Sequence, residues 1–249
     1  MRYFLLAVMA VLWITPATAG GLEDLSADER TAFRNEVRAY LLDNPEVLME
    51  AIAVLEARQK DNQSAGDQAM INAHSEEIYN DGFSYVGGNL QGDVTLVEFL
   101  DYRCTYCRKA HDEVAELVKS DGNIRLIIKE FPILGEQSLI SSKLAIATLH
   151  VAGPGAYAKI HDFLITFRGN LNANNMAALL EKIDQDPTPV LAYMENDAVN
   201  GQIGRVNGLA GNLQITGTPT FVLGENLIRG YVPLANMREL VTMVRNAKN

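Results

Sequence analysis

The sequence has few cysteines, few tryptophans and a shortage of positive charge. Of its 249 residues two are cysteine and one is tryptophan, and 21 basic residues stand against 31 acidic ones, which gives a formal net charge of -10 at pH 7. A chain with this excess of acid does not attract polyanions, so nucleic acid is not expected as a partner. The length is sufficient for one sizeable core with a small appended domain.

Long apolar runs are also scarce, and the one long run is at the N-terminus. It follows Arg2, covers residues 3–14 and leads into Pro16-Ala17-Thr18-Ala19. A basic start, a short apolar segment and an Ala-x-Ala end are typical of a secretory signal, so we predict that residues 1–19 are a signal peptide cleaved after about Ala19. The run is short for a membrane span, and an uncleaved anchor is the alternative.

What the chain does have is a close pair of cysteines, in the segment Cys104-Thr105-Tyr106-Cys107. The pair follows an apolar run at residues 94–100, which indicates a buried strand, and precedes apolar residues at helical spacing from Ala110 to Val118. Cys104 is therefore expected at the N-terminus of a helix, where free amides and the helix dipole favour a thiolate. Cys107, one turn further on, is placed to attack a mixed disulfide formed at Cys104.

Two structural interpretations of this pair are weaker. A disulfide across two intervening residues closes so short a loop that it removes little entropy from the unfolded chain. A zinc site would need a second pair of ligands, and neither His111 nor His150 stands at a ligand spacing. The sequence therefore predicts a redox-active dithiol that needs no metal and no other cofactor.

The region between the signal and the cysteine domain, residues 20–81, is predicted to be helical. Ser26-Ala27-Asp28-Glu29 is a capping box, and Asn44-Pro45 ends the first helix and begins a second. Both helices carry an apolar stripe, whereas residues 56–80 are mostly polar. An apolar stripe outside a domain has to be covered, so we expect this segment to mediate homo-oligomerisation; packing against its own catalytic domain is the alternative.

Residues 82–249 have the pattern of one mixed α/β domain. The predicted strands are 83–86, 94–100, 124–131, 220–223 and 227–229. A succession of helices at about 137–213 separates the third strand from the fourth, and a further helix closes the chain. Gly153-Pro154-Gly155 is expected to break the first of these inserted helices. The strand–helix–strand unit around the cysteines should be parallel and right-handed, with the helical block inserted into the domain.

These residues resemble the thioredoxin superfamily and, within it, the DsbA-like family of bacterial thiol-disulfide oxidoreductases. The resemblance covers residues 83–249 and is carried by Glu98-Phe99, Cys104-Thr105-Tyr106-Cys107, Lys129-Glu130-Phe131-Pro132 and Gly217-Thr218-Pro219-Thr220-Phe221. It implies a thioredoxin-like mixed sheet, an inserted helical subdomain and a periplasmic location. The N-terminal helices resemble those of oligomeric members of the copper-sensitivity suppressor type.

The resemblance also implies roles for particular residues. The expected substrate-binding residues are Thr105, Tyr106, Thr218 and Pro219, the last with a cis peptide bond. Glu98, an ionisable residue in an apolar strand, would be a buried acid that moves the proton of Cys107, with Lys129 as a candidate partner. A strand-end glutamate that reaches solvent and an edge lysine are the alternatives.

The activity implied by the resemblance is exchange with protein thiols and disulfides, with an unidentified membrane redox partner that recharges the protein. Strongly oxidising members of the family carry a histidine between the cysteines, whereas here the two residues are Thr105 and Tyr106. This difference, Thr218 and the helical extension favour a disulfide isomerase or reductase. A dedicated dithiol oxidase and a copper-binding redox chaperone, whose two thiolates would hold Cu(I), stay open as alternatives.

Overall fold

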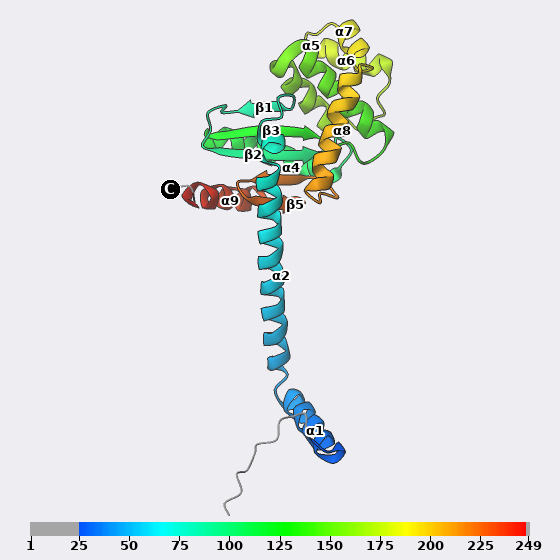
Figure 1. The fold of residues 1–249 in the computed structure, drawn as a ribbon. Helices are drawn as coiled ribbons and strands as arrows, with labels where there is room; N and C mark the ends of the chain where they lie inside the picture. Colours follow the sequence, from blue (N-terminus) through cyan, green and yellow to red (C-terminus); the bar gives the residue numbers. More distant parts are fainter. Residues whose placement is uncertain (1–24, 248–249) are drawn as a thin grey trace, which may run out of the picture. The chain divides into compact units, whose positions relative to one another are not determined.

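The computed structural model describes residues 25–247, and the predicted signal peptide at residues 1–19 lies outside this range. The chain divides into two compact units, and the division falls between Gln59 and Lys60. Figure 1 shows the helices and strands of both units. No helix among the described residues has both the length and the apolar character that crossing a membrane requires.

The first unit, in its described part, consists of α1 (Ala27–Asp43) and the beginning of α2 (Glu46–Ala73). The predicted capping box is present: the Glu29 amide donates to the Ser26 hydroxyl, and the Ser26 amide donates to the Glu29 carboxylate. No α1 side chain is buried. Large apolar side chains lie exposed along both helices: Phe33, Val37, Tyr40, Leu42, Leu48, Met49, Ile52, Val54 and Leu55. The unit therefore leaves an apolar surface uncovered.

The second unit is built on a five-stranded mixed sheet in the order β1-β3-β2-β4-β5. The strands are β1 (Tyr85–Gly88), β2 (Val94–Leu100), β3 (Ile124–Glu130), β4 (Thr220–Leu223) and β5 (Asn226–Arg229). β2 and β3 are parallel and are connected by α4 (Thr105–Asp121), while β1, β4 and β5 pair antiparallel. The expected thioredoxin-like sheet is confirmed, with its edge strand two residues further on than predicted.

Helices cover both faces of this sheet. α4 and α9 (Leu234–Ala247) bury one face, and Leu96 of β2 belongs to the apolar cluster between them and the sheet. α8 (Asp197–Asn212) covers the other face, where Phe99 is buried. Because alternate residues of a strand point to opposite faces, Glu98 lies on the same face as Leu96, under α4.

Helices between β3 and β4 form the predicted inserted subdomain. They are α5 (Glu136–Thr166), α6 (Ala173–Lys182), α7 (Pro187–Tyr193) and α8. α5 is interrupted at Gly153, which has φ 80° and ψ 179° and precedes Pro154, so the break predicted there is present. α5, α6 and α7 share an apolar core with Tyr102 and the two cysteines. The insertion thus closes over the end of the sheet that carries the motif.

The boundary between the two units differs from the one predicted at residue 81. The second half of α2 and the short α3 (Ser75–Tyr79) belong to the second unit, because Ile71 and Ile78 are buried in its core. Asp67 adds a two-pronged ion pair to Arg229 of β5, with both contacts at 2.8 Å. This segment contains few apolar residues, and two of them, Ile71 and Ile78, pack it into the core of the second unit.

Candidate active site

The cysteine motif lies where β2 ends and α4 begins. Cys104 is the N-cap of α4 and Cys107 is in its first turn, which is the placement predicted from the sequence. Both are free thiols. The exposed fraction is 7% for Cys104 and 1% for Cys107, so Cys104 is the less deeply buried of the two.

The surroundings of Cys104 favour its thiolate. A hydrogen bond from the Cys107 side chain is the largest influence, and burial opposes it. Hydrogen bonds from the Thr218 side chain and from the amides of Cys107 and Tyr106 add to the lowering. Together they lower the pKa of Cys104 to about 5. The Cys107 amide nitrogen lies 3.4 Å from the Cys104 sulfur, so the start of α4 is arranged to hold a negative charge.

The pKa of Cys107 moves in the opposite direction. Its hydrogen bond to Cys104, its burial and the charge of Glu98 raise the pKa of Cys107 far above that of an ordinary thiol. The pair is therefore asymmetric: a sulfur that ionises readily lies next to a more deeply buried one that keeps its proton. Cys107 needs a base before it can act as a nucleophile.

Thr218 and Pro219 lie against the motif from a distant part of the chain. The peptide bond between them is cis, as the resemblance implies. The Cys104 thiol donates to the Thr218 carbonyl oxygen over 3.1 Å. Thr105 and Tyr106 are exposed at the start of α4. The fold thus brings all four expected substrate-binding residues to the neighbourhood of Cys104.

A buried carboxylate, that of Asp101, fixes the loops around the motif. Its Oδ1 accepts from the Arg103 amide at 2.7 Å and from the Ser138 hydroxyl at 2.8 Å. Its Oδ2 accepts from the amides of Ile133 and Leu134 at 2.8 and 3.0 Å. One residue, which the sequence analysis did not single out, therefore ties the end of β2 to the loop after β3 and to α5.

Glu98 is beneath the motif and only 5% exposed, so it is a buried acid rather than a strand-end residue in solvent. Burial raises the pKa of Glu98 to about 7, against the opposing charge of His111. Glu98 and His111 line one cavity of about 120 Å³, and His111 Nε2 lies 3.3 Å from the carboxylate of the exposed Asp162. A carboxyl group of this pKa, with room for water beside it, can accept and release a proton near neutral pH.

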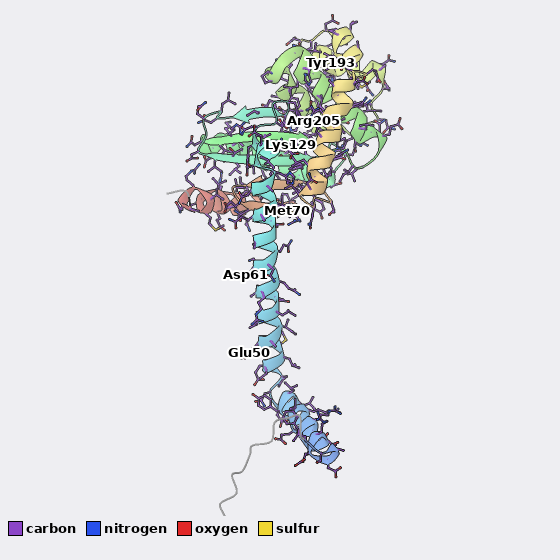
Figure 2. The ribbon with its side chains drawn as sticks, in the orientation of Figure 1. Glu50, Asp61, Met70, Lys129, Tyr193 and Arg205 are labelled. Atoms are coloured by element: carbon purple, nitrogen blue, oxygen red, sulfur yellow. The ribbon has the colours of Figure 1, made fainter. Side chains whose placement is uncertain are left out.

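Lys129 does not partner Glu98, and that prediction is wrong. In the pairing of β2 with β3, Lys129 aligns with Phe99, the neighbour of Glu98, so the two charges point to opposite faces of the sheet. The fully buried Lys129 ammonium lies 2.5 Å from Asp81 and 2.8 Å from the Glu77 carbonyl oxygen. Figure 2 shows Lys129 at the sheet. The ion pair holds the segment before β1 against the sheet.

A second buried carboxylate, Glu130, stands at the end of β3. The hydroxyls of Tyr157 and Tyr102 donate to its Oε1 at 2.6 and 2.9 Å, and the Tyr102 hydroxyl also lies 3.0 Å from His161 Nδ1. Burial raises the pKa of Glu130 to about 7 and lowers that of His161 to about 3. Like Glu98, Glu130 is an acidic residue in a largely apolar strand, so the sequence could have identified it by the same criterion. Nothing comparable in the sequence identifies Tyr157, its partner from α5.

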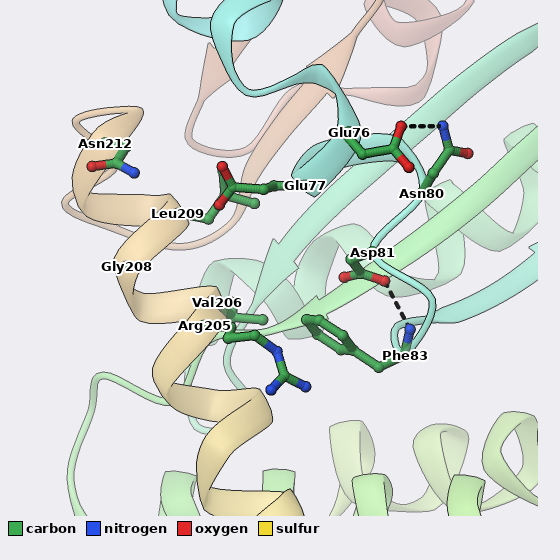
Figure 3. A pocket seen from close by; sticks show the side chains of 10 residues that line it. All are labelled: Glu76, Glu77, Asn80, Asp81, Phe83, Arg205, Val206, Gly208, Leu209 and Asn212. Carbon is green, nitrogen blue, oxygen red and sulfur yellow. Dashed lines mark hydrogen bonds between the residues drawn. The ribbon is translucent and has the colours of Figure 1, made fainter.

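A larger hollow of the second unit lies between α3 and α8. Its volume is about 540 Å³, and Figure 3 shows Phe83 beside Arg205, whose guanidinium carbon is 4.3 Å from the ring centroid. Glu76, Glu77 and Asp81 give it an acidic lining. It contains neither cysteine nor the cis-proline segment, so it is separate from the redox site.

Comparisons with known proteins agree with this arrangement of fold and site. The family described as Thioredoxin matches residues 80–242, more than half of the chain. A family described as the copper resistance protein ScsC N-terminal domain matches residues 29–61. The chain therefore belongs to the thioredoxin family, and it resembles DsbA-like and ScsC-type proteins.

Solved structures share the fold. A thioredoxin-like oxidoreductase from Silicibacter pomeroyi is 35% identical with a TM-score of 0.64, over 69% of this chain and 97% of that one. A linker-deletion mutant of Proteus mirabilis ScsC is 24% identical with a TM-score of 0.67, over 92% and 100% of the two chains. The thiol-disulfide exchange protein alpha-DsbA2 from Wolbachia pipientis is 24% identical with a TM-score of 0.69, over 74% and 98%. At the two lower identities the likeness concerns the fold alone.

Two curated relatives are much longer than this chain. The Na(+)/H(+) antiporter NhaA 3 of Salinispora tropica is 27% identical over 137 residues, which is 55% of this chain and 21% of the antiporter. NhaA 1 of Salinispora arenicola is 26% identical over 159 residues, 64% of this chain and 24% of that protein. The chain thus spans about a quarter or less of the length of these relatives.

Proposed function

We propose that this protein is a thiol-disulfide oxidoreductase that acts on protein disulfides as an isomerase or a reductase. The observation that supports this most is the asymmetric cysteine pair: the pKa of Cys104 is about 5, while that of the buried Cys107 is raised. Thr218, next to the cis Pro219, contacts the reactive sulfur. An accessible thiolate backed by a buried resolving thiol is what thiol-disulfide exchange requires.

The exchange begins at Cys104. Its thiolate attacks one sulfur of a substrate disulfide, the substrate S–S bond breaks, and the other substrate sulfur leaves as a thiolate with the electron pair of that bond. A mixed disulfide between Cys104 and the substrate remains. The main chain of Thr218 is available to pair with an extended substrate strand beside it.

The mixed disulfide then has two outcomes. In isomerisation a substrate thiolate attacks it, Cys104 leaves as the thiolate it was before, and no net electron transfer occurs. In reduction Glu98 accepts the Cys107 proton, the Cys107 thiolate attacks the Cys104 sulfur, and the substrate leaves as a dithiol. A dithiol reductant must then restore the pair, a role that we assign to an unidentified membrane redox partner.

The proposal includes export to the periplasm and self-association through the first unit. The exposed apolar side chains of α1 and α2 and the match of residues 29–61 to the ScsC N-terminal domain support self-association. A homo-oligomer would cover that surface and gather several Cys104 sites in one assembly. Repeated attack on one scrambled substrate, which isomerisation needs, would benefit from such an arrangement.

A second candidate function is the handling of Cu(I). The description of the family that matches residues 29–61 as a copper resistance protein favours it, and two thiolates suit a soft cation. Residues 25–247 hold no group of three or more histidine, cysteine or acidic side chains placed for a metal. This function therefore predicts stoichiometric copper binding at the Cys104 and Cys107 sulfurs, with little turnover of disulfides.

Reactivation of a scrambled, multiply disulfide-bonded protein by the reduced full-length chain tests the proposal. We expect Cys104→Ser to abolish reactivation, and Cys107→Ser to keep some shuffling while the mixed disulfide accumulates, because the resolving thiol is gone. Absence of reactivation, together with rapid oxidation of a reduced substrate by the disulfide form, would identify a dedicated oxidase. Stoichiometric Cu(I) binding without any exchange would favour the second candidate.

A further inference from the structure

Two arginines that flank the cysteine pair reach the same loop. Nη1 of Arg103 donates to the Gly169 carbonyl oxygen at 2.9 Å, and Nη2 of Arg108 donates to the Phe167 carbonyl oxygen at 2.8 Å. These two bonds hold the loop after α5 against the motif, at the residues on either side of Arg168. The loop therefore brings a third guanidinium group, that of Arg168, close enough to Arg108 for the two charges to repel.

No salt bridge among the described residues neutralises these three groups. Within residues 25–247 none of them forms an ion pair, and the exposed Arg168 makes no hydrogen bond. Asp101, the acid of the motif loop, is engaged with three amides and a hydroxyl. The charges also affect one another: burial and the positive charges of Arg168 and Arg103 lower the pKa of Arg108, and the negative charges of Asp101 and Cys104 oppose this only in part.

A structural role accounts for only part of this arrangement. The bonds of Arg103 and Arg108 secure the end of α5, but an uncharged amide side chain can donate to a carbonyl oxygen too. Arg168 donates no such bond. The cluster is positively charged, whereas the chain as a whole is acidic, with 31 acidic residues and 21 basic ones. The positive charge beside Cys104 is therefore only partly balanced within the described residues, and it can attract a partner of opposite charge.

We infer that the arginine cluster, formed by Arg103, Arg108 and Arg168, selects protein substrates in which acidic residues flank the reacting cysteine. Opposite charges near the reacting atoms speed the encounter and hold the complex, and salt weakens the effect. This inference rests on the proposed function, because a substrate meets these arginines while it exchanges at Cys104.

Matched peptide disulfides test the inference on the reduced full-length protein. Two peptides differ only in the residues next to their cysteine, aspartate in one and lysine in the other, and each carries the same small thiol in its disulfide. We expect the acidic peptide to react about tenfold faster at low ionic strength, with the ratio of the two rate constants falling toward one in high salt. The uncharged bis(2-hydroxyethyl) disulfide reports the reactivity of Cys104 without charge selection.

Arg168→Gln removes an exposed charge without breaking a hydrogen bond, so it is the informative variant. It should lower the acidic-to-basic ratio severalfold, and Arg103→Gln/Arg168→Gln should lower it further. Lys119→Gln removes an exposed charge from the far end of α4, about 18 Å from Cys107 by the helical rise, and should leave the ratio unchanged.

A wild-type ratio near one would overturn the inference, and so would a ratio that both arginine variants leave unchanged. Either result could occur while the uncharged disulfide still reacts normally, in which case the proposed function stands. Failure of the wild-type protein to react with the uncharged disulfide would instead contradict the proposed function itself.

Discussion

At the scale of single residues, position rather than residue type assigns the roles in this site. Cys104 and Cys107 are one helical turn apart, yet their pKa values move in opposite directions. The hydrogen bond between them leaves the negative charge on Cys104, which caps α4, and the proton on Cys107, which is buried in the first turn of the helix. Glu98 and Glu130 both have a pKa raised to about 7 by burial. Tyrosine hydroxyls bind Glu130, whereas Glu98 lines a cavity below the cysteines.

The low pKa of Cys104 predicts its alkylation behaviour. Because the thiolate is the reactive form, the rate of alkylation by iodoacetamide should rise with a midpoint near pH 5. Cys107→Ala should move this midpoint upward, since it removes the largest cause of the shift. Cys104→Ala should react negligibly at neutral pH, as Cys107 is buried and protonated. A wild-type midpoint near that of an ordinary thiol would contradict the assignment.

Glu98 is predicted to control the resolving step. In the wild-type protein, the rate at which Cys107 displaces a peptide from a mixed disulfide with Cys104 should rise as pH passes about 7, where Glu98 becomes a carboxylate. Glu98→Gln should slow this step about a hundredfold at neutral pH, because no base accepts the proton. Glu130→Gln is the matched control, a second buried acid with a pKa of about 7, and should keep the pH-dependent rise.

Glu98→Gln also has a predictable effect on the stability of the folded protein. The pKa of Glu98 rises from 4.5 to about 7 on folding, so its contribution is fully present below pH 4.5 and is lost as pH rises through 7. Above pH 7 the wild-type protein keeps a carboxylate in an apolar site, and Glu98→Gln should be more stable by about 3 kcal/mol. Urea unfolding of both proteins at pH 5 and pH 8 would show the difference growing with pH; a constant difference would argue against the shift.

At the scale of elements, the parallel pair β2 and β3 separates two functions by its two faces. The face under α4 presents Glu98 to the cysteines, while the opposite face carries the buried ion pair of Lys129 with Asp81. A one-residue step along the strand is enough to change the face. The chemistry of one face should therefore be insensitive to the charges of the other.

Breaking the ion pair should affect stability without affecting exchange. Asp81→Asn leaves the buried Lys129 ammonium without its counter-charge, which should cost about 3 kcal/mol in urea unfolding at fixed protein concentration. Lys129→Met/Asp81→Asn should recover much of that loss, because no charge is left buried. The pH midpoint of the resolving step should stay in place in both variants. A shifted midpoint would mean that Lys129 does communicate with Glu98.

At the scale of the whole molecule, the two units have different surfaces. The first unit leaves its apolar side chains exposed, whereas the second buries Ile71 of α2 and Ile78 of α3 in its own core. The fold that carries the two cysteines therefore includes the second half of α2. This placement defines where the chain can be shortened.

Truncation at two points should separate assembly from folding. The mature chain without residues 20–59 should stay folded and lose self-association, with reactivation of scrambled protein falling as the assembly is lost. The chain without residues 20–80 should also lose thermal stability, because it lacks Ile71, Ile78 and the ion pair from Asp67 to Arg229. Analytical ultracentrifugation and thermal unfolding measure the two effects. A monomeric full-length protein would contradict the role given to the first unit.

The sequence by itself determined the local features of this protein. The strand before the motif, Cys104 at a helix N-terminus, the break at Gly153 and the capping box at Ser26 all follow from short-range periodicity and backbone preference, and the structure has each of them. The order of these elements also predicted the mixed sheet with its inserted helices.

Only the tertiary structure decided which side chains meet. The resemblance implied Lys129 as a candidate partner of Glu98, but the strand register sends the two side chains to opposite faces of the sheet. The loops tied by Asp101 and the approach of Arg168 to the motif join residues far apart in the chain. Periodicity reports which face of an element is apolar, but contacts between distant segments depend on register and packing, which no local pattern encodes.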